Sequence, residues 1–412
     1  MLLLILERHF LYSRQNGRDT LMYYYYDAYT WIAAALVLAW VTWLIARRVL
    51  RNRRMRRPSR NNNRRELKGI VKIKRQLSST YLRPGMRGNI HAVGVGRLDD
   101  GRYCVQVFIS DRNFELWPGA GGTTLPNTYR GVPLILVEMP LAGLLSSSPA
   151  EVDQQISDLA NNPVEGIRGV EEVIVGGISG ANTNLFGESG TIGYFCTRKS
   201  AFRRQKEIHL LSNAHVFADL RKANLDDTDL IMQPSPGEAA SNRPIGSLVN
   251  FFPLKFETGI NDPNYVDGAV AKLWRPQPHK PVIPSIGSIK GHVVKKDVEI
   301  GEEVRKFGRT TGYTEGQIYS IYLDIWIGYA RTGKAAYFQD QLLVQPSQPD
   351  RFVAKGDSGS LLVDANQYAV GLIFAGMAGE AAQNADGLRI EGYGVANPIS
   401  EVLDRLKIDL VV

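Results

Sequence analysis

Cysteine is scarce in this chain, and Cys104 and Cys196 are its only two in 412 residues. They fall in different predicted domains, so a fold stapled by disulfides is excluded, and reduced thiols in a cytoplasmic protein are the simplest interpretation. Neither cysteine has a Cys or His partner at a spacing that binds zinc, and a serine fills the predicted nucleophile position. The sequence therefore predicts no metal site and no cofactor.

Acidic residues are almost absent between Arg47 and Lys68, where eleven Lys or Arg side chains are offset by Glu66 alone. The formal net charge of the chain is +8, so this run supplies the positive balance and the remainder sums to about −2. The run has no interleaved aromatic residues and no recognisable nucleic-acid module, which disfavours nucleic acid as a partner. We interpret residues 47–66 as a basic linker that would bind anionic membrane lipid.

Charge is lacking altogether over residues 28–46, which hold Trp31, Trp40 and Trp43. About 20 apolar residues cross a bilayer as a helix, and aromatic residues collect at its interfaces. This pattern predicts a single transmembrane helix after an N-terminal segment, residues 1–27. The basic residues that follow would keep the C-terminal side in the cytoplasm, which predicts a single-pass membrane protein. A buried helix of a soluble domain is the alternative.

Helical spacing of apolar residues predicts a helix over residues 66–81. Alternating patterns and turn signals predict three strands, over residues 90–95, 103–109 and 132–137. Together these elements indicate a small α+β module at residues 67–145 that has no catalytic constellation of its own. A connector, residues 146–184, would follow, with a short helix near residues 152–159.

Three motifs downstream carry chemistry. Gly356-Asp357-Ser358-Gly359-Ser360 would present the Ser358 hydroxyl on a sharp turn and point the amides of Gly356 and Ser358 at one spot, as an oxyanion hole requires. His215 ends an apolar run, and Asp267 opens an apolar strand. The order His, Asp, Ser is the order of the chymotrypsin-type triad, in which Ser358 attacks, His215 transfers the proton and Asp267 orients the imidazole.

Each triad position has a rival or a structural explanation. His209 precedes the apolar run rather than ending it, and Asp262 lies in a stretch with turn chemistry. A lone histidine at a strand end, or a lone aspartate before a strand, is usually structural. The joint occurrence of three residue types in one order favours the triad. Gly308-Arg309-Thr310-Thr311-Gly312 is interpreted as a turn between strands.

Several of these segments, taken together, resemble a family of trypsin-like serine peptidases that is widespread in bacteria and includes the narrow-leaf protein of plants. The segments are Ser189–Phe195, Leu211–His215, Val266–Ala269, Gly308–Gly312 and Gly356–Ser360. The resemblance covers roughly residues 67–412, and it departs from the family at Gly268, where alanine is usual.

The resemblance also implies a substrate pocket. The residue six before the serine, Phe352, would lie at the base of the primary pocket, with Phe374 and Gly376 in its wall. No acidic residue stands there, which disfavours Lys or Arg in the substrate and favours a small or apolar side chain.

The predicted fold is mainly β, a chymotrypsin-like double β-barrel at residues 185–412, with the upstream α+β module and the transmembrane helix. The predicted function is a membrane-anchored serine endopeptidase acting on protein or peptide substrates, with the oligomeric state left open. Two alternatives remain. The fold is a catalytically silent scaffold or interaction protein at the membrane, or the upstream module restrains the protease until a partner binds.

Overall fold

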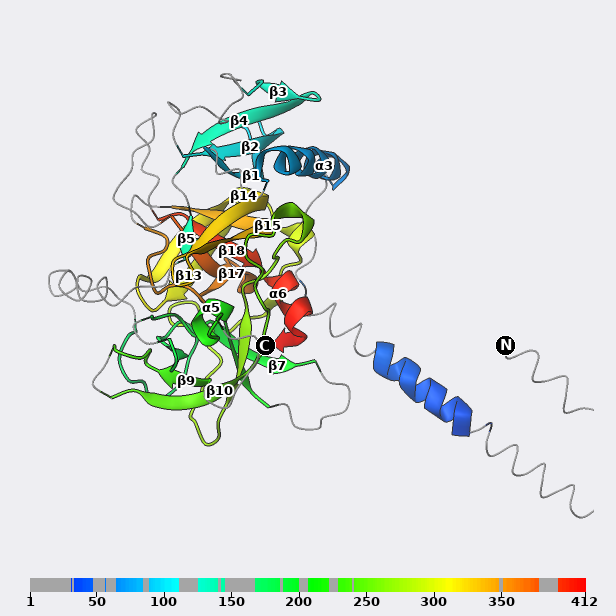
Figure 1. Ribbon diagram of the computed structural model, residues 1–412. Coiled ribbons are helices and arrows are strands. Elements are labelled where there is room, and N and C mark those ends of the chain that lie inside the picture. The colour runs from blue at the N-terminus through cyan, green and yellow to red at the C-terminus, as the bar shows by residue number, and fades with distance from the viewer. Residues whose placement is uncertain are drawn as a thin grey trace, which may run out of the picture. The chain divides into compact units, whose positions relative to one another are not determined.

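The structure is a computed structural model (Figure 1). It describes residues 31, 33–46, 56, 64–83, 89–110, 125–139, 142–144, 167–185, 188–199, 207–221, 229–238, 241–347, 351–377 and 392–412. The chain divides into two compact units, Met1–Arg56 and Arg57–Val412. The predicted segment 1–27, most of the basic linker and the predicted helix at residues 152–159 lie outside the described residues.

The prediction of a transmembrane helix, and with it of a single-pass membrane location, is wrong. The described helical run covers residues 33–46, whereas about 20 residues are needed to cross the hydrocarbon core. Within the described ranges, none of the helices combines the length and the apolar character that a membrane crossing requires.

One barrel closes through a shared strand. β13 pairs with both β14 and β16, so the order β13-β16-β17-β18-β15-β14 returns to its start. Short β12 pairs with β17, and the 3-10 turns η1 and η2 flank the barrel. The bounds are β12 Gly291–His292, β13 Glu303–Gly308, β14 Gly312–Tyr329, β15 Lys334–Pro346, β16 Leu361–Asp364, β17 Tyr368–Gly376, β18 Gly394–Pro398, η1 Gly259–Asn261 and η2 Lys295–Asp297. We call this the second barrel.

The other sheet has the order β19-β7-β8-β11-β10-β9-β6. An isolated bridge between Ser179 and Thr191 links the segments that lead into β6 and β7. The bounds are β6 Ala181–Asn182, β7 Tyr194–Arg198, β8 His209–Ser212, α5 Ala214–Phe217, β9 Leu230–Gln233, β10 Arg243–Phe251, β11 Ala269–Leu273, α6 Ile399–Leu406 and β19 Ile408–Leu410. This first barrel thus receives its edge strand β19 from the C-terminal part of the chain.

The core of the first barrel also packs the C-terminal helix. The apolar stripe of α6, which includes Ile399, Val402 and Leu406, is fully buried and belongs to the same hydrophobic cluster as Leu211 and Val270 of β8 and β11. Because α6 follows β18 directly, the helix ties the two barrels together.

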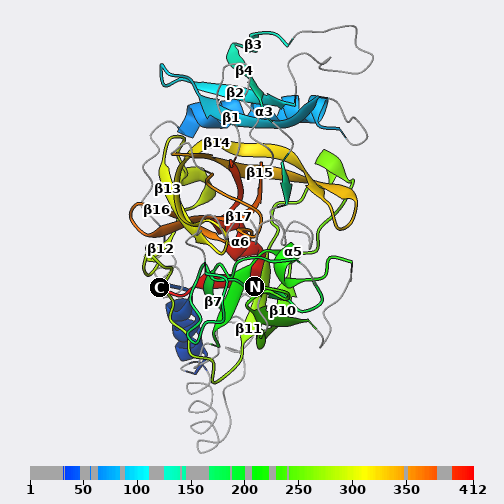
Figure 2. The same cartoon turned by 90° about the vertical axis from the view of Figure 1, so that its left-hand side faces the viewer.

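The predicted upstream helix and three strands occur as α3, β1, β2 and β4, and two short strands, β3 and β5, were not predicted. The bounds are α3 Arg64–Tyr81, β1 Ile90–Arg97, β2 Tyr103–Ile109, β3 Thr128–Tyr129, β4 Val132–Glu138 and β5 Gly143–Leu144. Strand β1 pairs antiparallel with β14, Ala92 opposite Ile325, so the sheet of this segment continues that of the second barrel. Figures 1 and 2 show β1, β2 and β4 stacked beyond β14, with α3 beside them.

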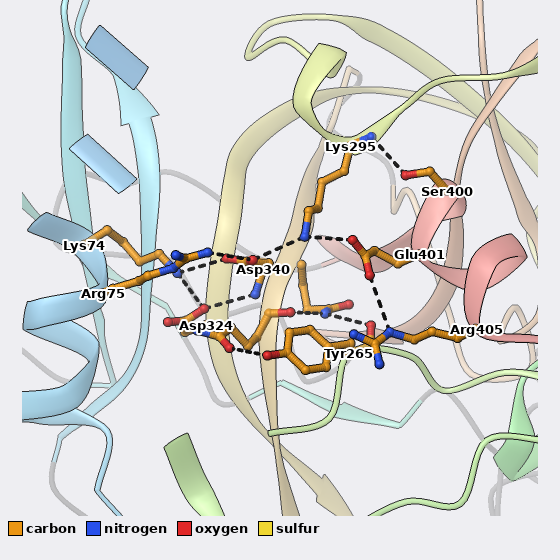
Figure 3. A network of polar contacts seen from close by, with 11 residues as sticks. Lys74, Arg75, Tyr265, Lys295, Asp324, Asp340, Ser400, Glu401 and Arg405 are labelled. Atoms are coloured by element: carbon orange, nitrogen blue, oxygen red, sulfur yellow. Dashed lines mark hydrogen bonds and ion pairs between the residues drawn. The ribbon is translucent and has the colours of Figure 1, made fainter. Parts of the chain in front are cut away.

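A buried ion cluster fastens α3 to the second barrel (Figure 3). Lys74 is 0% exposed, and its Nζ lies 2.6 Å from Asp324 Oδ1 and 3.4 Å from Asp340 Oδ1. Lys295 Nζ lies 3.2 Å from Asp340 Oδ2 and 2.9 Å from Glu401 of α6. Burial acts to raise the pKa of Asp340, but Lys74, Lys295 and Arg75 outweigh it, and this pKa lies below its ordinary value.

Candidate active site

The first barrel brings His215 and Asp267 together through strand pairing. β8 and β11 are antiparallel neighbours with Ser212 opposite Ala269, so the residues that follow β8 meet those that precede β11. His215 Nδ1 lies 2.6 Å from Asp267 Oδ2, and the His215 backbone N–H donates to Asp267 Oδ1 at 3.1 Å. An ionised carboxylate in this position makes Nδ1 the protonated nitrogen and leaves Nε2 as the base.

Neighbouring polar groups fix the aspartate from several sides. The Tyr329 hydroxyl donates to Asp267 Oδ2 at 2.8 Å. The Asp267 backbone N–H donates to Asn397 Oδ1 at 3.0 Å, and Asn213 Nδ2 donates to the Asp267 carbonyl at 2.8 Å. Asp267 is 0% exposed, and a buried carboxylate is tolerated where donors surround it in this way.

The rival residues lie elsewhere. His209 Nδ1 lies 3.0 Å from the Glu207 carbonyl, and burial lowers its pKa. Asp262 is exposed and forms an ion pair with Lys255. Neither residue contacts His215 or Asp267 in the described part of the chain, so of the alternatives weighed, His215 and Asp267 alone form an acid–base pair.

The loop that carries Ser358 packs against the first barrel. The backbone N–H of Thr191 donates to the Ser358 carbonyl at 2.8 Å, and Thr191 Oγ1 donates to the Gly356 carbonyl at 2.9 Å. Gly359 has φ +97°, and a Cβ there would lie 2.1 Å from the Thr191 carbonyl oxygen and 2.3 Å from Ser212 Oγ. Only glycine fits such a close approach with this backbone conformation. The loop therefore lies beside the strand end that leads to His215.

Thr191 is a functional candidate that belongs to none of the three catalytic motifs of the sequence. It lies inside the segment Ser189–Phe195, which carried part of the family resemblance. That resemblance was the one available signal, because nothing in the local pattern distinguishes a threonine that bridges two barrels from any other strand residue.

The amides of Gly356 and Ser358 are free within the described structure, since neither donates to another described residue. Gly356 has φ +96°, and a Cβ there would lie 2.4 Å from Thr310 Oγ1. The amides are thus unsatisfied donors on a rigid turn next to the serine, which is what an oxyanion hole needs.

Asp357 points away from the site into the second barrel and anchors the loop. Its Oδ2 lies 3.2 Å from Lys306 Nζ, both side chains being 0% exposed. The carboxylate also accepts hydrogen bonds from Thr311 Oγ1 at 2.7 Å and from the amides of Thr310 and Ala354, each at 2.9 Å. Burial acts to raise the pKa of Asp357, but Lys306 and these donors outweigh it and lower the pKa.

The turn Gly308–Gly312 joins β13 to β14, as interpreted from sequence, and its threonines bind Asp357. Arg309 in this turn is 2% exposed and forms an ion pair with Glu238 of the first barrel. Burial lowers its pKa to about 9. The turn therefore links the serine loop to both barrels.

The serine hydroxyl does not engage the histidine in this conformation. Ser358 Oγ donates to the Phe374 carbonyl at 3.2 Å, and His215 Nε2 has no hydrogen-bond partner among the described groups. Ser358 is 0% and His215 3% exposed. For attack, the serine side chain would have to leave Phe374 and turn to Nε2.

Phe352 and Phe374, the predicted pocket residues, are both 0% exposed and belong to the core of the second barrel. The Phe374 ring packs on Phe338, with centroids 4.7 Å apart. Gly376 pairs with Gly394 of β18 and with Gly143 of β5. The pocket stays a prediction, because residues 378–391, which adjoin this edge, lie outside the described ranges. Among the described residues, no three His, Cys, Asp or Glu side chains are placed to hold a metal ion.

Comparison with known proteins finds remote similarity by sequence. The family model described as the Nal1 C-terminal domain matches residues 280–412. Protein NARROW LEAF 1 of Oryza sativa subsp. japonica is 26% identical over 306 residues, which is 67% of this chain and 48% of that protein. The chain thus spans about half the length of this curated relative, of which it is a weak homologue.

Structural comparison gives trypsin-like serine proteases as neighbours, with weak scores. Thermobifida fusca protease A has 16% identity and a TM-score of 0.36, with 58% of this chain and 99% of that chain covered. Cellulomonas bogoriensis chymotrypsin has 16% identity and a TM-score of 0.35, with 58% and 98% covered. The chain is mainly β by its own strands, and these neighbours have a chymotrypsin-like fold.

Proposed function

We propose that this protein is a serine endopeptidase that cleaves peptide bonds through an acyl-enzyme. Ser358 Oγ bonds to the substrate carbonyl carbon while its proton passes to His215 Nε2, and the amides of Gly356 and Ser358 stabilise the oxyanion. Collapse breaks the C–N bond, and His215 returns the proton to the departing amine. Water then attacks the acyl-enzyme with His215 again as the base, the ester bond to Ser358 Oγ breaks, and His215 returns the proton to that oxygen. Asp267 orients the imidazole and stabilises its cation.

One observation carries the proposal. The 2.6 Å contact between His215 Nδ1 and Asp267 Oδ2, both groups being buried, supports an imidazole with a fixed tautomer and a basic Nε2. Structural ion pairs between histidine and aspartate also occur. Here, however, Nε2 has no described partner and the glycine-flanked serine loop packs three residues upstream of the histidine, against Ser212. A merely structural histidine is usually satisfied at both nitrogens.

A specific observation also favours a second function, a protease fold that has no catalytic activity and acts as a scaffold. Ser358 Oγ is bound to the Phe374 carbonyl instead of to the imidazole. If the hydroxyl stayed there, no proton would pass to His215. Catalytic hydrogen bonds are often long or misaligned before substrate binds, and this is why we favour the enzyme over the scaffold.

A fluorophosphonate probe separates the two functions without knowledge of the substrate. In the enzyme, the full chain labels, and Ser358→Ala and His215→Gln both abolish labelling, because the probe reports a nucleophile activated by its base. Ser360→Ala, in the same loop, serves as the control for nonspecific reaction. A folded wild-type chain that does not label at any pH between 6 and 9 would refute the enzyme and leave the scaffold.

The same proposal extends to domains and substrate. We propose that the two barrels form the protease domain, with an upstream module at residues 67–145. The boundary expected from sequence, with a connector at residues 146–184 and the protease domain at 185–412, is moved upstream here, because β6 Ala181–Asn182 pairs with β9 of the first barrel and Ile174 and Ile178 lie in its core. The absence of an acidic residue at Phe352, Phe374 and Gly376 supports a preference for small or apolar side chains before the scissile bond. Profiling with a peptide library, read by mass spectrometry, tests this preference, and enrichment of Lys or Arg there would contradict it.

A further inference from the structure

Tyr329 ends β14 of the second barrel, yet its hydroxyl contacts the aspartate of the first barrel. It donates to Asp267 Oδ2 at 2.8 Å, the same oxygen that lies 2.6 Å from His215 Nδ1. Tyr329 is 1% exposed. One hydrogen bond to the Asp267 carboxylate therefore comes from a residue of the other barrel, 62 positions later in the sequence.

Packing fixes the direction of this hydroxyl. The Tyr329 ring meets Phe256 edge-on with centroids 5.3 Å apart, stacks on Phe338 at 6.4 Å, and meets the His215 ring edge-on at 6.2 Å. Edge-on and offset arrangements are the favourable ones for aromatic pairs. Because three rings confine the Tyr329 ring, its hydroxyl is oriented before any substrate binds. The His215 imidazole packs against this same ring, and the Tyr329 hydroxyl binds Asp267, the carboxylate that contacts the imidazole.

The groups that contact Asp267 divide into titrating and neutral ones. His215 comes from α5 and Tyr329 from β14, while the amides of Asn213 and Asn397 carry no charge. Burial first, and the Asp267 charge second, raise the pKa of Tyr329 well above its ordinary value. The phenol therefore stays protonated at neutral pH and remains a hydrogen-bond donor.

We propose that Tyr329 is a positioning residue for the catalytic pair: its hydroxyl orients the Asp267 carboxylate and draws part of the negative charge of Oδ2 away from the imidazole. This inference rests on the proposed peptidase function. A hydrogen bond to a charged group stabilises that charge, so the donor competes with the imidazolium for one oxygen. The imidazolium is then less stable, and His215 remains an unprotonated base to lower pH than it would without the tyrosine.

Tyr329→Phe tests this inference because it retains the ring and removes the donor. The pH midpoint of the His215 imidazole is measured by NMR in the Ser358→Ala chain, with the signal assigned by its loss in His215→Gln. We expect Tyr329→Phe to raise this midpoint by about one pH unit, the size that one charge-assisted hydrogen bond confers. In the chain with Ser358 intact, the acid limb of fluorophosphonate labelling moves by the same amount. Tyr393→Phe, in the same core cluster but packed on Tyr319, leaves both midpoints unchanged.

The possible results distinguish a failure of the positioning inference for Tyr329 from a failure of the proposed peptidase function. If wild type labels and Tyr329→Phe moves neither midpoint, the positioning inference is refuted and the peptidase stands. If Tyr329→Phe lowers the melting temperature and labelling equally at all pH values, Tyr329 is merely structural and the inference is likewise refuted. If wild type never labels while the NMR midpoint still rises in Tyr329→Phe, the peptidase fails and the effect of Tyr329 on the imidazole is supported.

Discussion

Replacing Lys74 by methionine removes the cation at the centre of the buried cluster while keeping most of the side-chain volume (Figure 3). Lys74 and Asp324 are both 0% exposed and 2.6 Å apart. After the change Asp324 retains a hydrogen bond from the Asp340 amide at 3.0 Å, and Asp340 retains Lys295 at 3.2 Å. Asp324 is thus the carboxylate that loses its ion-pair partner.

The size of the effect follows from burial. Removing one partner of a buried ion pair costs about 3–5 kcal/mol, because the remaining charge has neither water nor a counter-ion. For a chain of this size about 2 °C of melting temperature corresponds to 1 kcal/mol. We therefore expect Lys74→Met to lower the melting temperature of the full chain by about 6–10 °C.

Differential scanning calorimetry on the full chain measures this shift, with two matched variants. Arg75→Met alters the neighbouring residue of the same helix, whose side chain is 55% exposed and lies 3.5 Å from Asp340, so its cost stays within about 1 kcal/mol. Lys74→Met combined with Asp324→Leu removes both charges and should recover most of the loss. A Lys74→Met chain as stable as Arg75→Met would refute the reasoning, as would a double variant no better than the single one.

Three further changes test other parts of the structure. Gly359→Ala should abolish fluorophosphonate labelling, because its Cβ would lie 2.1 Å from the Thr191 carbonyl oxygen. Gly237→Ala is the control, since Gly237 has φ +89° and no atom lies within 4 Å of the added Cβ. This control should lower the free energy of unfolding by about 1 kcal/mol and leave labelling intact. Lys306→Met removes the counter-ion of Asp357 and should reduce labelling at least about tenfold at pH 7 and destabilise the chain by about 3–5 kcal/mol; labelling equal to wild type would show that the loop needs no anchor. Burial lowers the pKa of His91 to about 4 from 6.5, so the unfolded chain binds a proton that the folded chain does not, and the free energy of unfolding should fall by about 3 kcal/mol as pH falls from 6.5 to 4. Urea titrations at several pH values should find that the free energy of unfolding declines less steeply with falling pH in His91→Phe than in wild type. An identical decline in the two chains would contradict the assignment of this pH dependence to His91.

Local patterns were enough to predict many elements but not their long-range pairing. The helix α3 and the strands β1, β2 and β4 occur where spacing and turn signals placed them. The pairing of β1 with β14 joins residues more than 200 positions apart. Two-residue periodicity indicates a strand but does not show which strand it pairs with. The pairing of β1 with β14 could therefore not be predicted from the sequence.

The candidate site divides in the same way. His215 and Asp267 were predicted because the chemistry requires those residue types in that order. Tyr329 and Lys306 were not, because a tyrosine at a strand end and a lysine within a strand are ordinary residues until the barrels pack. The transmembrane helix failed for a related reason. Uncharged, aromatic-rich composition satisfied the hydropathy pattern over residues 28–46, but within the described ranges no helix is both long and apolar enough to cross a membrane.

The late position of β19 has a consequence for biosynthesis. The first barrel carries His215 and Asp267, yet its edge strand Ile408–Leu410, which pairs with Tyr194–Arg198, is synthesised well after both residues. The hydrogen bond from the Asp267 amide to Asn397 Oδ1 likewise forms only after residue 397 has been synthesised. Domains fold as their residues leave the ribosome, so a nascent chain that already contains both residues still lacks the groups that fix them. Synthesis itself therefore delays assembly of the acid–base pair until residues 397–410 have left the ribosome, and a product truncated before residue 397 would lack these contacts.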